Sequence, residues 1–213
     1  MNKQYLKIIE HYEECFNKYG DNNMGVDWPN LNDALIRYKI MLDIVPSKGN
    51  YSLLDFGCGA AHLYDFIIKN SYKNINYSGL DLSEVFINFC RLKYKKIVFI
   101  CSDILQTPDQ IGIYDYIVLN GVFTEKRELR FENMFDYFKE VIKTLFQKTS
   151  IGIAFNVMTK HVDRERNDLF HLPFDLLASF LKDEVTRNFI VRNDYGLFEY
   201  TIYLFKEPNT WHR

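Results

Sequence analysis

The segment that most constrains the fold is Leu54-Asp55-Phe56-Gly57-Cys58-Gly59-Ala60-Ala61, where an apolar run ends in an acid and a two-glycine turn. Residues 62–68, which follow directly, have a helical pattern. Glycines allow positive φ and a close approach of the backbone to a ligand, and a helix start offers N–H groups without partners inside the helix. A strand, tight turn and helix in this order predict a ligand-binding edge of an α/β sheet.

The spacing of the glycines restricts the class of ligand. A dinucleotide-binding turn has glycines at its first, third and sixth positions. Gly57 and Gly59 occupy the first and third positions, but the sixth residue is His62. The sequence therefore disfavours a pyrophosphate ligand. A nicotinamide-dependent oxidoreductase stays open as an alternative.

Three further apolar runs end in polar residues. Residues 75–80 precede Asp81, residues 97–102 precede Asp103, and residues 114–119 precede Asn120. A carboxylate at a strand end can accept hydrogen bonds from the two hydroxyls of a ribose. Because the carboxyl ends of parallel strands meet at one edge of a sheet, we expect a nucleoside-like ligand there.

These segments resemble the motifs of the class I S-adenosylmethionine-dependent methyltransferases. The resemblance rests on residues 53–59, 79–83, 101–104 and 114–123 and covers roughly residues 30–206. It implies an α/β, Rossmann-like fold with a seven-stranded, mostly parallel sheet, helices on both faces and a C-terminal antiparallel hairpin. A third glycine that is common in the family's turn is Ala61 here.

The resemblance also implies S-adenosylmethionine as the cofactor and S-adenosylhomocysteine as the product. In the family, the first turn contacts the methionine part, the second acid binds the ribose, and the third acid with its neighbour frames the adenine. The implied cofactor-binding residues are Asp55, Gly57, Cys58, Gly59, Asp81, Leu82, Asp103, Ile104, Asn120 and Gly121, with Trp28 and Arg37 from an N-terminal lid. We expect Arg37 to pair with the cofactor carboxylate.

Periodicity predicts the remaining organisation. Residues 4–19 form a helix with one apolar face, and a second helix runs from Pro29 towards Pro46, so residues 1–48 are expected to be a helical cap before a core of residues 49–213. The clearest amphipathic helix spans residues 131–146. The runs 189–192 and 198–205 predict an antiparallel pair, because their connection is too short for a parallel crossover.

The acceptor of the methyl group is less well defined. Transfer depends mainly on positioning, so a general base is optional, and the candidate catalytic residues are Asn120 and His161. Basic residues within 160–171 suggest an anionic acceptor, although interleaved acids also allow ion pairs within that loop. We expect the methyl group to be transferred to an oxygen or nitrogen of a small polar molecule, which can be anionic. An alternative that stays open is a module that binds the cofactor or a nucleotide without catalysis.

Composition sets broad limits on partners and location. The 213 residues have a net charge of −2, so no basic excess points to nucleic acid, and no apolar run has the roughly 20 residues of a membrane span. The charged first seven residues do not resemble an export signal. The four cysteines lack paired-ligand spacing. We therefore expect a cytoplasmic protein without a metal; its oligomeric state is open.

Overall fold

The computed structural model describes residues 5–209. Residues 1–4 and 210–213 lie outside the described residues. Part of the prediction about export depends on residues 1–4. The helices are α1 (Leu6–Tyr19), η2 (Asn23–Val26), α2 (Leu31–Leu42), α3 (His62–Lys69), α4 (Glu84–Lys93), η3 (Pro108–Gln110), α5 (Phe131–Gln147), α6 (Phe174–Phe180) and η4 (Leu181–Val185). The strands are β1 (Tyr51–Phe56), β2 (Ile75–Asp81), β3 (Val98–Cys101), β4 (Tyr114–Phe123), β5 (Thr149–Met158), β6 (Phe189–Arg192) and β7 (Glu199–Phe205).

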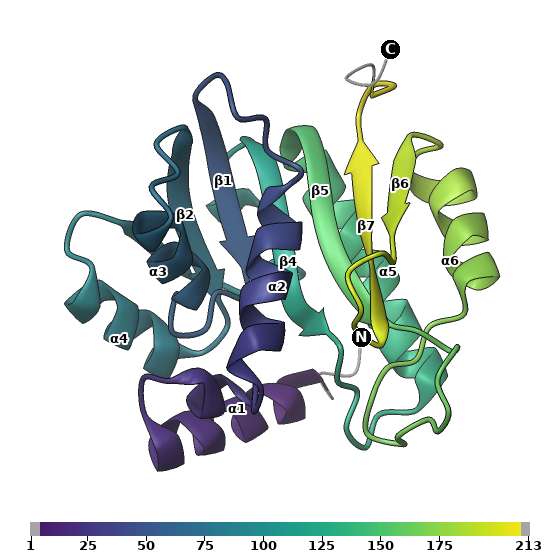
Figure 1. The fold of residues 1–213 in the computed structure, drawn as a ribbon, viewed down its shortest axis with the longest axis horizontal. Helices are drawn as coiled ribbons and strands as arrows, with labels where there is room; N and C mark the ends of the chain where they lie inside the picture. The colour runs from purple at the N-terminus through teal and green to yellow at the C-terminus, as the bar shows by residue number, and fades with distance from the viewer. Residues whose placement is uncertain (1–4, 210–213) are drawn as a thin grey trace.

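The strands form one seven-stranded sheet in the order β3-β2-β1-β4-β5-β7-β6 (Figure 1). Neighbouring strands from β3 to β5 pair in parallel, whereas β7 pairs antiparallel with both β5 and β6. The structure thus confirms the predicted fold: a Rossmann-like, mostly parallel sheet with an antiparallel C-terminal hairpin.

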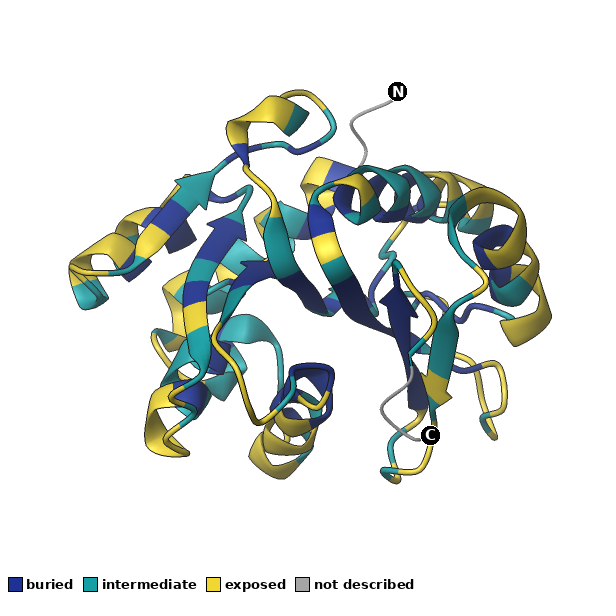
Figure 2. Cartoon of the chain, turned by 90° about the horizontal axis from the view of Figure 1, so that it is seen from above, coloured by how far each residue is buried: buried dark blue, intermediate teal, exposed yellow. Residues whose placement is uncertain are grey.

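Apolar side chains on the two sides of the sheet form two separate cores. Along β1, Leu54 joins the core under α5 and α6, and Leu53 joins the core under α2, α3 and α4. The alternation follows from the two-residue period of a strand, which sends neighbouring side chains to opposite faces. Figure 2 shows the buried strands between helices whose outer sides are exposed.

The helix α1 has a different position from the others. It lies below the ends of β1 and β4 in Figure 1, across the carboxyl edge of the sheet, and its residues Tyr5 and Ile8 join the core under α5. By contrast, α2 packs on one face of the sheet. The boundary between cap and core at residue 48 stays a prediction. None of the described helices is long and apolar enough to cross a membrane.

Candidate active site

A cavity of about 150 Å³ lies at the carboxyl edge of the sheet, enclosed by α1, the turn after β1 and the ends of β2 and β4. Its walls are mostly apolar and aromatic, with Tyr12, Trp28, Tyr38 and Tyr137 among them. Ligand cavities in open α/β sheets occur at this edge. This volume is below the usual range of about 300–1000 Å³ for a drug-sized ligand, so we expect the cavity to widen when a nucleoside binds.

The turn after β1 is fixed by its own hydrogen bonds. The amides of Gly57 and Cys58 both donate to the carbonyl of Leu80, over 2.7 and 3.0 Å, and the amide of Gly59 donates to Asp81 Oδ2 over 2.9 Å. Gly57 has φ +73°, and a Cβ there would lie 2.7 Å from a methyl of Val122. The turn is therefore closely packed, and these amides are already engaged.

Two buried carboxylates line the cavity. Asp55 accepts a 2.7 Å hydrogen bond from the hydroxyl of Tyr77, and burial raises the pKa of Asp55 to about 7. Burial also raises the pKa of Asp81, although the backbone N–H groups of Ser83 and Gly59 donate to it and oppose the shift. Among the described residues that line the cavity there is no lysine or arginine. The cavity therefore favours a cationic ligand.

The end of β4 adds a neutral acceptor. The side-chain Oδ1 of Asn120 is buried and has no hydrogen-bond partner among the described residues. Next to it, Gly121 has φ +81° and donates its amide to Asn156 Oδ1 over 2.8 Å. A Cβ on Gly121 would lie 2.7 Å from Trp28 Cζ2. The cavity lining thus includes Asn120, whose acceptor is unused among the described residues, and Trp28, which lies close to Gly121.

The structure brings together most of the residues that the sequence predicts. The predicted residues that line the cavity are Trp28, Asp55, Gly57, Cys58, Gly59, Asp81, Leu82, Asn120 and Gly121. Four others lie outside this lining: Arg37, Asp103, Ile104 and His161. Their expected roles stay predictions.

The residues outside the lining have other partners or surroundings. Asp103 accepts a 2.6 Å hydrogen bond from the hydroxyl of Tyr5. Arg37 lies 4.8 Å from the ring of Trp28 but donates to the buried carboxylate of Glu199 over 2.8 Å. Ile104 is buried in the core, and the side chain of His161 is exposed.

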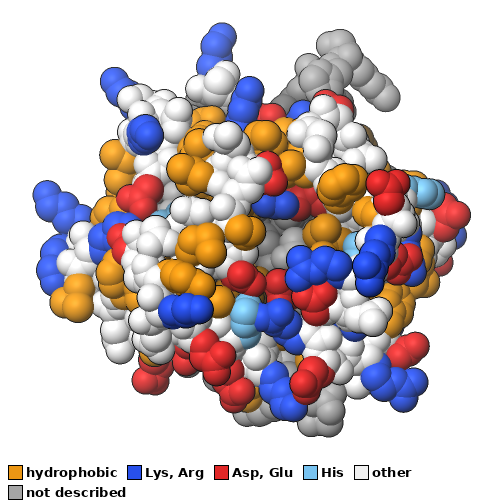
Figure 3. Space-filling view, turned by 60° about the horizontal axis from the view of Figure 1, so that its bottom comes forward, with side chains coloured by type: hydrophobic (Ala, Val, Ile, Leu, Met, Phe, Trp, Pro, Cys, Tyr) orange, Lys and Arg blue, Asp and Glu red, His pale blue; other side chains and the backbone are white. Residues whose placement is uncertain are grey.

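The basic residues after β5 are largely paired within their own loop. Lys160 forms a 2.8 Å ion pair with Glu165, and Arg166 pairs with Asp168. His171 is buried, with Nδ1 2.6 Å from the carbonyl of Thr159. Figure 3 shows acidic and basic side chains interspersed on this side of the molecule. Ion pairing within the loop therefore accounts for Lys160 and Arg166 without an anionic acceptor.

Sequence reasoning missed much of the apolar lining. Ile8, Ile9 and Tyr12 of α1 line the cavity, as does His62, which pairs with Asp21 over 2.9 Å. The apolar face of residues 4–19 predicts that this helix packs against the rest of the protein. It does not predict which part of the protein the helix contacts. The covering of a cavity follows only from the three-dimensional arrangement.

Two comparisons with known sequences both find methyltransferases. Residues 54–148 match the model of a family described as "Methyltransferase domain". A curated protein of Mycobacterium tuberculosis, named "Putative methyltransferase Rv1506c", is 25% identical over 164 residues, which cover 75% of this chain and 95% of that protein.

Solved structures agree in fold. The magnesium protoporphyrin IX methyltransferase of Synechocystis, crystallised with bound SAM, is 13% identical with a TM-score of 0.63, covering 96% of this chain and 97% of its own. The 1,6-didemethyltoxoflavin-N1-methyltransferase of Burkholderia thailandensis is 12% identical with a TM-score of 0.61, covering 96% of this chain and 87% of its own.

Proposed function

We propose that this class I S-adenosylmethionine-dependent methyltransferase transfers a methyl group to an oxygen or nitrogen of a small polar molecule. The observation that carries the proposal is the acceptor-rich cavity, which is lined by Asp55, Asp81 and Asn120 and has no lysine or arginine among its described lining residues. Asn120 Oδ1 is buried and has no partner among the described residues. Such a site suits a ligand with a positive charge and a ribose.

The residues present fit S-adenosylmethionine. Asp81 would hold the ribose hydroxyls, since each carboxylate oxygen has a lone pair left after the bonds from Gly59 and Ser83. Asp55 and Asn120 would accept from the ammonium group, which supplies the donor that Asn120 Oδ1 lacks. When bound, the cofactor supplies an electrophilic methyl group on a sulfonium centre.

The chain's own contribution is positioning and exclusion of water. The apolar face of α1, with Ile8 and Tyr12, closes the cavity and would keep water from the reacting atoms. Asn120 would orient the bound groups through its side-chain oxygen. His161 is exposed and outside the lining, so we propose an acceptor that is already nucleophilic or loses its proton to water.

The alternatives differ in what they require. A nicotinamide cofactor needs backbone N–H groups free for its pyrophosphate, but those of Gly57, Cys58 and Gly59 are bonded within the protein. A module without catalysis would bind the cofactor and form no product.

The net charge of −2 also favours a small-molecule acceptor over nucleic acid. We propose a cytoplasmic location on the same sequence grounds as above.

An acceptor screen tests this function. Purified protein and S-adenosylmethionine are incubated with panels of neutral alcohols and phenols, amines, carboxylates and phosphates, and formation of S-adenosylhomocysteine is measured. We expect turnover with members of one oxygen or nitrogen class and none with the Asp81→Asn variant. Turnover only on carbon acceptors or nucleic acid would contradict the proposal, and binding without any turnover would favour the module.

A further inference from the structure

A second group of polar side chains lies outside the cavity, where α1 meets the turn that follows it. His11 and Cys15 are four residues apart on α1, so they share one face of the helix. Asp27 follows η2 directly and has left-handed backbone angles, with φ 54°. The ring nitrogen, sulfur and carboxylate oxygen of these residues all lie within 4.8 Å of one another.

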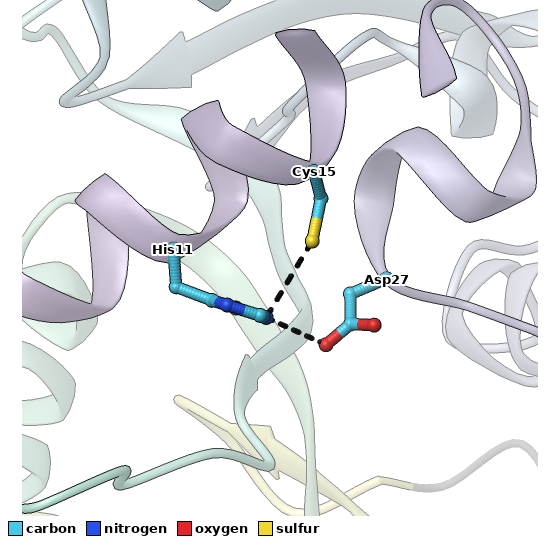
Figure 4. A group of neighbouring side chains, drawn as sticks. All are labelled: His11, Cys15 and Asp27. Atoms are coloured by element: carbon cyan, nitrogen blue, oxygen red, sulfur yellow. Dashed lines mark hydrogen bonds and ion pairs between the residues drawn. The ribbon is translucent and has the colours of Figure 1, made fainter. Parts of the chain in front are cut away.

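Both contacts of the group use the same atom of the histidine. His11 Nε2 lies 2.7 Å from Asp27 Oδ2 and 3.7 Å from Cys15 Sγ, and Figure 4 shows the two side chains converging on this nitrogen. A catalytic triad would place the thiol and the acid on opposite nitrogens of the ring. Here both contacts share one nitrogen instead, and the three potential ligand atoms lie within 4.8 Å of one another.

We propose that His11, Cys15 and Asp27 bind a divalent zinc-type cation, with water in the fourth position. Imidazole nitrogen, thiolate sulfur and carboxylate oxygen are the three ligand types that zinc takes from proteins. Donor atoms about 2.0–2.3 Å from a tetrahedral ion lie roughly 3.3–3.8 Å apart. The His11–Cys15 separation of 3.7 Å meets this spacing, and the His11–Asp27 contact would widen by under about 1 Å.

Charges of both signs lie near the group. Glu125 is 8% exposed, and its charge acts on Asp27 and His11. Arg127, which pairs with Glu125 over 3.0 Å, acts on Cys15, and Arg166 interacts with Asp27. The side chains of His11 and Asp27 keep 23% and 32% of their surface exposed, which leaves an entry path for an ion. Access for an ion is therefore present on the side of His11 and Asp27.

The position of the site gives the ion a structural role. Two ligands come from α1, which covers the cavity, and the third immediately precedes Trp28, which lines the cavity wall. A bound ion would therefore hold α1 against the segment that carries Trp28. A search for paired cysteines in the sequence does not find such a site, because its ligands are of three residue types and one comes from a turn.

Metal titration of the full-length, metal-free protein tests the proposal without S-adenosylmethionine, so its outcome is independent of the proposed function. We expect one equivalent of Zn²⁺ to bind, and Co²⁺ in its place to show a thiolate-to-metal charge-transfer band. Cys15→Ser should abolish that band, and Asp27→Asn should weaken Zn²⁺ binding by at least about tenfold. Asparagine tolerates the left-handed conformation at position 27, so this variant keeps the turn.

The matched control is Cys101→Ser, which removes another half-buried free cysteine, at the end of β3 and outside the group, and should leave the band and the affinity unchanged. Folding of every variant is checked by circular dichroism. The proposal is overturned if the wild-type protein binds less than one equivalent of Zn²⁺ at micromolar concentration. It is equally overturned if the Co²⁺ band survives in folded Cys15→Ser or disappears in Cys101→Ser.

Discussion

Asp55 combines two properties that conflict in a folded protein. It is 3% exposed and carries a carboxylate whose pKa burial raises to about 7, yet it lines the cavity that we assign to a cation. In the unfolded chain its pKa is near 3.8, so between about pH 4 and pH 7 the folded state binds more protons than the unfolded state. Ionisation of Asp55 therefore lowers stability as the pH rises through this window.

Asp55→Asn removes the charge and keeps an acceptor for Tyr77. We expect a higher melting temperature than wild type at pH 8, and a stability that falls less between pH 4 and pH 7, where one proton accounts for up to about 1.4 kcal/mol per pH unit. The affinity for S-adenosylhomocysteine at pH 8 should fall about tenfold, because a charged acceptor of its ammonium is lost. A lower melting temperature with unchanged affinity would show that Asp55 is structural.

Gly121 and Gly196 form a natural pair of test and control. Both have positive φ, +81° and +76°, but a Cβ would meet Trp28 at 2.7 Å in one case and nothing within 4 Å in the other. We expect alanine at Gly196 to cost about 1 kcal/mol of unfolding free energy in urea titrations, and alanine at Gly121 to cost more, because Trp28 must also shift. Only Gly121→Ala should also weaken S-adenosylhomocysteine binding, because it displaces Trp28. Equal loss of affinity in both variants would remove Trp28 from the site.

At the scale of single residues, the sequence predicts the site where local motifs carry it. Asp55 near the end of β1 and the glycines after β1, together with Asp81 and Asn120, lie where the alternation of strand and helix places them. Ala61, where the family commonly has glycine, takes up φ 61° despite its Cβ. The bond of Arg37 to Glu199 joins residues 162 positions apart, and no local pattern contains that information.

At the scale of elements, α1 covers the cavity and is tied to the core at its first turn. Tyr5 at its start donates to Asp103 over 2.6 Å and stacks on Tyr137 with ring centroids 4.7 Å apart. Asp103 is the acid that the family resemblance assigns to the adenine, so the hydroxyl of Tyr5 occupies an acceptor that the ligand would need.

Tyr5→Phe keeps the stacking on Tyr137 and frees Asp103. We expect S-adenosylhomocysteine to bind more tightly, by up to about tenfold, since the ligand no longer displaces a hydrogen bond to a charged group. Tyr19→Phe on the exposed end of α1 is the control and should change nothing. Weaker binding by Tyr5→Phe, measured by calorimetry, would mean that the Tyr5 hydroxyl contacts the ligand itself.

Elements with strong periodicity agree with their predictions, whereas the short helix α6 has no prediction. The helix predicted over residues 131–146 is α5 (Phe131–Gln147), and the predicted hairpin is β6 and β7. The sequence gives no signal for α6, a helix of seven residues that continues into the π-helical turn η4. A helix of two turns has too few positions on one face for the helical period of apolar residues to be recognised in the sequence.

At the scale of the whole molecule, a buried polar network links the cap to the sheet beside the cavity. Arg37 of α2 donates to Glu199 at the start of β7, whose side chain is 1% exposed. Glu199 also accepts a 3.1 Å hydrogen bond from Asn156 of β5, which in turn accepts from the amide of Gly121. The network thus reaches from α2 through two strands to the cavity wall.

Arg37→Ala leaves the Glu199 carboxylate buried without its cation. We expect a loss of about 3–5 kcal/mol in unfolding free energy, measured in urea. The double variant Arg37→Ala with Glu199→Gln should recover much of this loss, because it removes the uncompensated charge. A single variant as stable as the wild type would instead indicate that Arg37 is free to serve a ligand carboxylate, as the resemblance to the family implies.

Every role proposed for these residues depends on binding of S-adenosylmethionine in the cavity at the carboxyl edge of the sheet. Calorimetric titration of the purified protein at pH 8 with this compound measures it directly. We predict one binding site per chain with a dissociation constant in the micromolar range, which corresponds to roughly −6 to −8 kcal/mol. Absence of any binding at concentrations up to about 1 mM would contradict the account.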